Sequence, residues 1–141
     1  MAIRTNLNYR FKRSAEHEER MKYLVHDLRL FRSYSQILMV SAVIGYNKDA
    51  FSPIKTPASD TVQMTTFQEK DRDVIDFIAF AYKKEQSVLN SDEKYSIFEA
   101  FANGGFPILF DKLGIDFQNR EKNNRVALMK KYLSLLLANK F

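Results

Sequence analysis

The segment 97–113, IFEAFANGGFPILFDKL, constrains the fold of this chain more than any other stretch of its sequence. Two patterns of helical spacing meet there, and the adjacent residues Gly104 and Gly105 separate them. Asparagine and glycine favour the end of a helix, and Pro107 suits the first turn of a new one, where its missing N–H costs nothing. The pattern therefore predicts a helix that begins near Ser91 and ends at Asn103, then a short helix from Pro107 to Leu113.

The rest of the chain predicts further helices and one long irregular connection. Apolar spacing and capping residues place helices over about 15–32, 36–44 and 71–88 and from about Arg120 onward, although the apolar run 37–44 could also be a buried strand. The last helix is expected to turn five residues inward: Val126, Met129, Leu133, Leu136 and Leu137. Within 46–66, the alternation around Val62 suggests a strand paired with the region of Ile54.

These patterns predict an all-α, mainly helical fold. We expect a single orthogonal bundle of five to six helices with a possible small β-hairpin around residues 52–66. Residues 1–13 would form a basic N-terminal arm, and residues 14–141 a single helical domain, which suits a chain of 141 residues that is 45% hydrophobic. The connection 46–66 is either a recognition loop or a surface loop tethered over the core.

Composition narrows the classes of protein that this chain can belong to. It contains no cysteine, so disulfide frameworks and thiolate chemistry are excluded. The first thirteen residues are basic and polar, unlike a secretory signal, and the longest apolar stretch, 37–44, is only eight residues. We therefore expect a cytoplasmic protein that neither spans nor binds a membrane.

No group of residues in the sequence indicates catalysis or a metal site. His17 and His26 would lie on opposite faces of one helix, and the acids Asp71, Asp73 and Asp76 lack the glycine turn and terminal glutamate of a calcium loop. The motifs of serine hydrolases, zinc proteases and phosphate-binding loops are missing from the sequence. Glu99 and Asn103, one helical turn apart, could form a polar site or satisfy the exposed amides of the glycine turn. We expect no enzyme activity, no metal and no cofactor.

Charge is distributed unevenly along the chain. Residues 1–13 carry four bases and no acid, residues 34–117 hold twelve acids and eight bases, and residues 118–141 hold six bases and one acid. If the two basic ends meet, they form a patch for an anionic partner such as DNA. The alternative is that both ends are simply solvated. The candidate nucleic-acid contacts are Arg4, Arg10, Lys12, Arg13, Arg120, Lys122, Arg125, Lys130 and Lys131.

Two sequence patterns resemble those of the DNA phosphorothioation-associated protein 4 family. One is Val40-x-Ala42-x-x-Gly45-Tyr46, and the other, within 97–109, contains E-x-[YF]-A-N-G-G at Glu99, Asn103, Gly104 and Gly105. The resemblance spans about residues 13–115 and leaves out the last helix. Proteins of this family accompany bacterial DNA sulfur-modification and related defence systems. The resemblance thus implies a genomic context and supplies no catalytic residues.

Two functions are consistent with these observations. The first is a non-catalytic accessory protein of a bacterial DNA modification or restriction (anti-phage defence) system that contacts DNA through its basic ends. The second is a protein–protein adaptor or oligomeric scaffold that binds a larger component of the same system. The twelve phenylalanines and seven tyrosines favour an interface of this second kind, which could join two copies of the chain.

Overall fold

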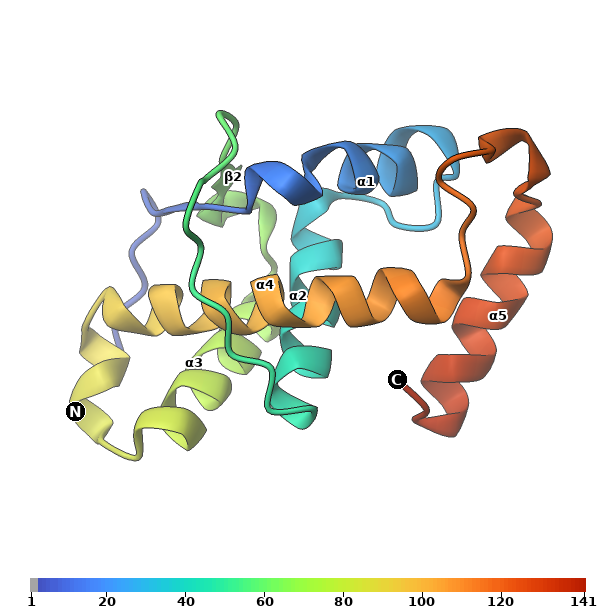
Figure 1. The fold of residues 1–141 in the computed structure, drawn as a ribbon. Helices are drawn as coiled ribbons and strands as arrows, with labels where there is room; N and C mark the ends of the chain where they lie inside the picture. The colour runs from blue at the N-terminus through green and yellow to red at the C-terminus, as the bar shows by residue number, and fades with distance from the viewer. Residues whose placement is uncertain (1–2) are drawn as a thin grey trace.

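One long helix, α4, lies at the centre of the structure, and the other elements pack around it (Figure 1). The computed structural model describes residues 3–141. In chain order the elements are β1 (Arg10–Phe11), η1 (Ala15–His17), α1 (Glu18–Lys22), η2 (Tyr23–Asp27), α2 (Tyr34–Asn47), β2 (Val62–Gln63), η3 (Met64–Thr66), α3 (Glu69–Lys83), η4 (Gln86–Asn90), α4 (Glu93–Leu113), η5 (Arg120–Lys122) and α5 (Arg125–Ala138). The predicted mainly helical fold is confirmed.

The predicted helix break at Gly104 and Gly105 is wrong, because α4 runs through both glycines and Pro107 without interruption. A Cβ atom on Gly105 would lie 1.8 Å from the carbonyl oxygen of Ser41 in α2. On Gly45 of α2, a Cβ would lie 2.0 Å from a backbone oxygen of α4. The glycines therefore allow two helices to cross with their backbones in contact, a role that outweighs their low helix propensity.

Burial on both sides of the glycines explains why α4 remains one helix. Phe98 and Phe101 before them, and Phe106 and Leu109 after them, are all fully buried or nearly so. A turn at Gly104 would carry one of these pairs out of the core. Helical stability in proteins comes mainly from such packing, so the continuous helix is favoured.

The first predicted helix, 15–32, is shorter and less regular than expected. It consists of a 3-10 turn, a short α-helix and a π-helical turn, and it ends at Asp27. Arg29 then adopts a left-handed conformation with φ of 51°, which prevents the helix from continuing. In α2 the N-cap is Ser33, whose side chain accepts a hydrogen bond from the N–H of Gln36, so this helix begins two residues before the predicted start. Lys84, with φ of 60°, ends α3 four residues before the predicted end at Val88.

The predicted strand around Val62 exists, but its expected pairing with the region of Ile54 is wrong. Antiparallel pairing joins Val62 to Phe11 and Gln63 to Arg10. Phe11 is fully buried. The basic N-terminal segment therefore lies against the body of the protein instead of extending from it, at least from residue 9 onward.

The expected inner face of the last helix is also wrong. In α5, Leu128 and Tyr132 are buried, whereas Val126, Leu133, Leu136 and Leu137 are exposed. Apolar residues cover more than half of the circumference of this helix, so periodicity alone does not select the face that packs inward. None of the helices within residues 3–141 is long and apolar enough to cross a membrane.

Candidate nucleic-acid interface

Glu99 and Asn103, the polar residues of the family-like motif, hold the N-terminal segment against α4. One Glu99 carboxylate oxygen accepts a hydrogen bond of 2.6 Å from the backbone N–H of Lys12, and the other accepts one of 3.1 Å from the hydroxyl of Tyr9. The side-chain oxygen of Asn103 accepts a bond of 2.5 Å from Ser14 Oγ. Burial raises the pKa of Glu99, although the two hydrogen bonds oppose that shift. These residues are therefore structural, and they hold a distant segment instead of a glycine turn.

The connection between α2 and β2 is held in the same way. Asn103 Nδ2 donates a hydrogen bond of 2.8 Å to the carbonyl of Ser52, and the backbone N–H of Ala15 donates one of 2.9 Å to the carbonyl of Thr56. In Figure 1 this connection, drawn in green, passes in front of α4. Hydrogen bonds to α4 and η1 thus hold its backbone in place.

The predicted cations near the N-terminus have different environments. Arg4 forms an ion pair of 3.2 Å with Asp92, just before α4 begins. Arg13 is only 3% exposed, and its guanidinium lies 4.4 Å from the centre of the Tyr34 ring. Arg10 and Lys12 are exposed. Arg13 is therefore unavailable to a macromolecular partner, whereas Arg10 and Lys12 remain accessible.

The two basic ends of the chain lie at opposite ends of α4. Arg4 is beside Asp92, whereas the Lys131 ammonium lies beside Gly114, which immediately follows the helix. A helix of 21 residues is about 30 Å long at a rise of about 1.5 Å per residue. Arg4 therefore belongs to a different part of the surface from the exposed cations of α5, Arg125, Lys130 and Lys131.

The cations at the C-terminal end instead meet bases from the first helical segment. Arg125, the first residue of α5, donates hydrogen bonds through Nε to the carbonyl of Leu28 at 2.7 Å and through Nη2 to that of Arg29 at 3.1 Å. It thereby satisfies backbone oxygens where the helical segment ends. Figure 1 shows the chain rising from the end of α4 to reach this segment before α5 begins.

Aromatic stacking fixes two more arginines at the same place. The guanidinium carbons of Arg20 and Arg120 lie 5.0 and 4.0 Å from the centre of the Phe117 ring. Arg120 also lies over the Tyr23 ring, and the Tyr23 hydroxyl donates a hydrogen bond of 3.3 Å to the Arg120 carbonyl. The stacked rings order these guanidinium groups. Arg120 Nε also donates a hydrogen bond of 3.4 Å to the Phe117 carbonyl, and its terminal nitrogens carry the remaining donors. Arg29 and Lys122 are exposed neighbours in the same two segments. We name the whole set the basic junction: Arg20, Arg29, Arg120, Lys122 and Arg125.

Sequence reasoning missed Arg20 and Arg29 because residues 14–33 balance four acids against four bases. Three of the acids precede residue 20, whereas Arg29 and Arg32 follow Asp27, so the charge is separated within the segment. This gradient is the signal that could have revealed them. None of the ion pairs found within residues 3–141 involves a cation of the basic junction.

The surface carries exposed cations, which suit it to anionic partners. Exposed arginine and lysine side chains neutralise phosphates and carry no sequence information by that contact alone. Over residues 3–141, the acids and histidines form no cluster of three that could hold a metal ion. His17 is buried against Phe106, with ring centres 5.0 Å apart, and burial lowers its pKa. His26, by contrast, lies at the surface and contacts the Tyr34 hydroxyl.

Comparison with known proteins gives one result. Neither a search of curated proteins nor a search of solved structures found a match to the chain. A family model matches residues 10–134, which include the E-x-F-A-N-G-G motif, the basic junction and most of α5. The match thus reaches beyond the motif region at both ends. Because it covers most of the chain, the protein belongs to the family described as DNA sulphur modification system-associated protein 4, and it is an accessory protein of such a system.

Proposed function

We propose that this protein is a non-catalytic, cytoplasmic accessory factor that binds the DNA on which its modification system acts. The basic junction makes the contact with DNA, and the neighbouring cation Lys131 of α5 adds to it. The observation that carries this proposal is the convergence of cations from residues 20–29 and 120–125, about 100 positions apart in sequence, on one ordered surface. Each cation would pair with a backbone phosphate, so affinity would not depend on base sequence.

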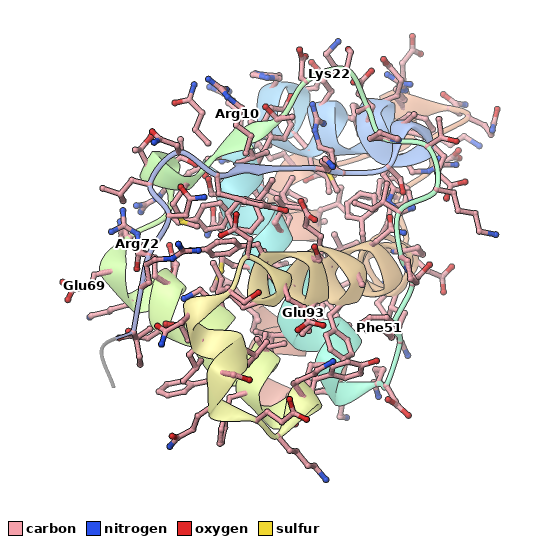
Figure 2. The ribbon with its side chains drawn as sticks, turned by 90° about the vertical axis from the view of Figure 1, so that its left-hand side faces the viewer. Arg10, Lys22, Phe51, Glu69, Arg72 and Glu93 are labelled. Carbon is pink, nitrogen blue, oxygen red and sulfur yellow. The ribbon has the colours of Figure 1, made fainter. Side chains whose placement is uncertain are left out.

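The proposed surface differs from the patch expected from the chain ends alone. Arg4 and Arg13 have partners within the protein, and Arg4 lies about 30 Å from Lys131 along α4. Arg10 and Lys22 lie along the same edge in Figure 2, with Glu69 on a different side. Lys22 is an exposed base of α1, the helix that also carries Arg20, although Glu18 and Glu19 begin that helix.

Fluorescence anisotropy with a labelled duplex tests this proposal. Each neutralised phosphate contributes about −0.9 to the slope of log affinity against log salt, so the five cations of the basic junction alone predict a slope near −4.5, which Lys131 would steepen. Affinity should then fall roughly 500-fold between about 50 and 200 mM salt. Parallel titrations with plain and phosphorothioate duplexes show whether the sulfur is distinguished. Absence of binding at low salt would exclude the proposal.

A charge-matched pair of variants tests the location of the surface. The double variant Arg120→Glu/Lys122→Glu should lose most of the binding and most of the salt dependence. Lys70→Glu/Lys84→Glu changes the net charge equally at exposed positions of α3 and just beyond its end. Binding by this control should remain within a few-fold of the unmodified protein. Equal losses in the two variants would show that only net charge matters and would contradict the assignment.

A protein–protein adaptor is the second candidate function. The outer face of α5 favours it, because Leu137 is 88% exposed and the exposed Leu133 and Val126, four and eleven residues before it, lie on the same side of the helix. A larger component of the same system would be the partner. Gel filtration of the purified components tests this function, and the Arg120→Glu/Lys122→Glu variant should still bind if DNA contact and adaptation use separate surfaces.

A further inference from the structure

The loop 114–124, between α4 and α5, presents two cations of the basic junction, Arg120 and Lys122. Figure 1 shows this loop, drawn in dark orange, rising from the end of α4 to the level of α1. None of its residues is fully buried, so packing in the core does not by itself fix its conformation. Hydrogen bonds must then supply much of its order. The side chains that make these bonds therefore determine how the two cations are presented.

Asn123 joins the two ends of the loop. Its side-chain oxygen accepts a hydrogen bond of 2.9 Å from the backbone N–H of Asp116, and its Nδ2 donates one of 3.0 Å to the Asp116 carbonyl. Nδ2 also donates a bond of 2.8 Å to the hydroxyl of Tyr23. Asp116 continues the network, since its Oδ1 accepts bonds of 3.2 and 2.9 Å from the N–H groups of Gln118 and Asn119. One amide side chain thus closes the loop and attaches it to the first helical segment.

Tyr23 is the point of attachment on that segment. Both hydrogen bonds of its hydroxyl go to the loop, because it accepts from Asn123 and donates to the carbonyl of Arg120 at 3.3 Å. The buried ring lies under the Arg120 guanidinium, with 5.1 Å between the guanidinium carbon and the ring centre. It also meets the Phe117 ring edge to face, with centres 5.9 Å apart. The ring therefore packs in the core, whereas the hydroxyl serves the loop.

The backbone at this point of attachment is unusual in two ways. Tyr23–Asp27 forms a π-helical turn, in which the N–H of Leu28 donates a hydrogen bond of 2.9 Å to the carbonyl of Tyr23. Such turns are rare and occur frequently at functional sites. Arg29 then has a left-handed φ of 51°, and its carbonyl accepts a hydrogen bond from Arg125. Uncommon backbone conformations persist where surrounding contacts hold them, and here the contacts come from the loop and the residue that follows it.

We propose that Tyr23 and Asn123 are positioning residues for the DNA contact. Their hydrogen bonds hold the loop so that Arg120 and Lys122 meet phosphates from an already ordered surface. This inference rests on the proposed function, because it concerns the same surface. Without the hydroxyl, the loop would adopt the binding conformation only part of the time, and the apparent affinity would fall by that fraction. The factor would be the same at every salt concentration, since the number of cations that meet phosphates is unchanged.

Anisotropy titrations over about 50 to 200 mM salt separate loss of order from loss of charge. Tyr23→Phe keeps the ring beneath Arg120 and removes only the hydroxyl, so it should weaken binding roughly 3–10-fold with an unchanged salt slope. Asn123→Ala removes every hydrogen bond of that side chain and should weaken binding further, again with an unchanged slope. As matched controls, Tyr132→Phe removes the hydroxyl of another buried tyrosine, and Asn119→Ala removes an exposed amide from the loop itself. Both controls should bind as the unmodified protein does.

Amide hydrogen exchange measures the order of the loop without DNA. In Tyr23→Phe and Asn123→Ala, the amides of residues 116–124 should exchange faster than in the unmodified protein, and more so than those of α4. Circular dichroism melting curves confirm that each variant is folded. An increase in α4 equal to that in the loop would show general destabilisation, which contradicts a positioning role.

Failure of this inference can be told apart from failure of the proposed function. If the unmodified protein does not bind DNA at low salt, the proposed function fails and the positioning role with it. If it binds DNA, but either variant binds equally well or shows a lower salt slope, only the positioning role is refuted. The same holds if affinity falls while exchange in the loop is unchanged, because the side chain then acts by another route.

Discussion

Substitution of Gly105 by alanine tests whether backbone contact between α2 and α4 determines the fold. The new Cβ would lie 1.8 Å from the Ser41 carbonyl oxygen, whereas ordinary contact begins at 3.4 Å, so that oxygen must move by the difference, 1.6 Å. The backbone N of Gly45 would also be only 2.7 Å away. Both obstacles are backbone atoms of one buried helix, so a change of side-chain rotamer cannot relieve them.

The expected magnitude follows from two opposing effects. Overpacking of a core costs about 1–3 kcal/mol, and the rigidity of this site places the cost near the upper end, about 3 kcal/mol. Alanine in a helix interior gains about 1 kcal/mol over glycine. We therefore expect Gly105→Ala to lose about 2 kcal/mol, which lowers the Tm by roughly 4–8 °C in a chain of this size.

Circular dichroism at 222 nm, followed during heating and in urea, measures this loss. Gly104→Ala should lose less stability than Gly105→Ala. Its Cβ would lie 1.9 Å from the carbonyl oxygen of Ala50, but Ala50 is in a loop that can shift. Lys112→Ala, an exposed change on the same helix, should stay within about 0.5 kcal/mol. If Gly105→Ala is as stable as the unmodified protein, close backbone packing does not explain why these glycines occur within a helix.

Two further predictions concern Glu99 and the start of α5. Burial raises the pKa of Glu99 above its ordinary value of 4.5, so its stabilising contribution is complete below that pH and is lost as pH rises through the raised pKa. Urea unfolding of Glu99→Gln and of the unmodified protein from about pH 4 to 7 measures the free energy of unfolding of each. The variant should gain stability relative to the unmodified protein as pH rises. A difference that stays flat or falls with pH would contradict this. Asn124 caps α5 by accepting a hydrogen bond of 3.0 Å from the N–H of Ala127, and Asn124→Ala should weaken the helix by about 1 kcal/mol, whereas Asn124→Ser should not. Amide hydrogen exchange in α5 measures the effect, and unchanged protection in the alanine variant would show that the cap is unimportant.

The mainly helical class could be predicted because hydrophobic periodicity and capping residues are local signals. They located most of α2, α3 and α5 and the strand at Val62. The same local signals wrongly predicted a helix break at Gly104, because glycine occurs both at helix ends and where two helices cross closely. The deciding fact is the position of Ser41 and Gly45, which only the folded structure supplies.

The candidate site could be predicted less well than the fold, because it depends on contacts between residues that are distant in the sequence. The excess of bases near both chain ends is visible in the sequence, but the burial of Arg13 on Tyr34 and the pairing of Arg4 with Asp92 are not. The basic junction depends on Phe117, whose ring lies beneath two arginines 100 positions apart. The face of α5 was likewise undetermined, because its leucines occur on more than one side of the helix.

Attachment of the N-terminal segment to α4 affects the order of events during synthesis. Asn6 hydrogen-bonds the Tyr95 hydroxyl, Lys12 bonds Glu99, and β1 pairs with a strand more than fifty residues away. On the ribosome, the segment 3–14 therefore lacks these partners until α4, which ends at Leu113, has been translated. The segment stays exposed over that interval, and the native core around α4 forms only afterwards.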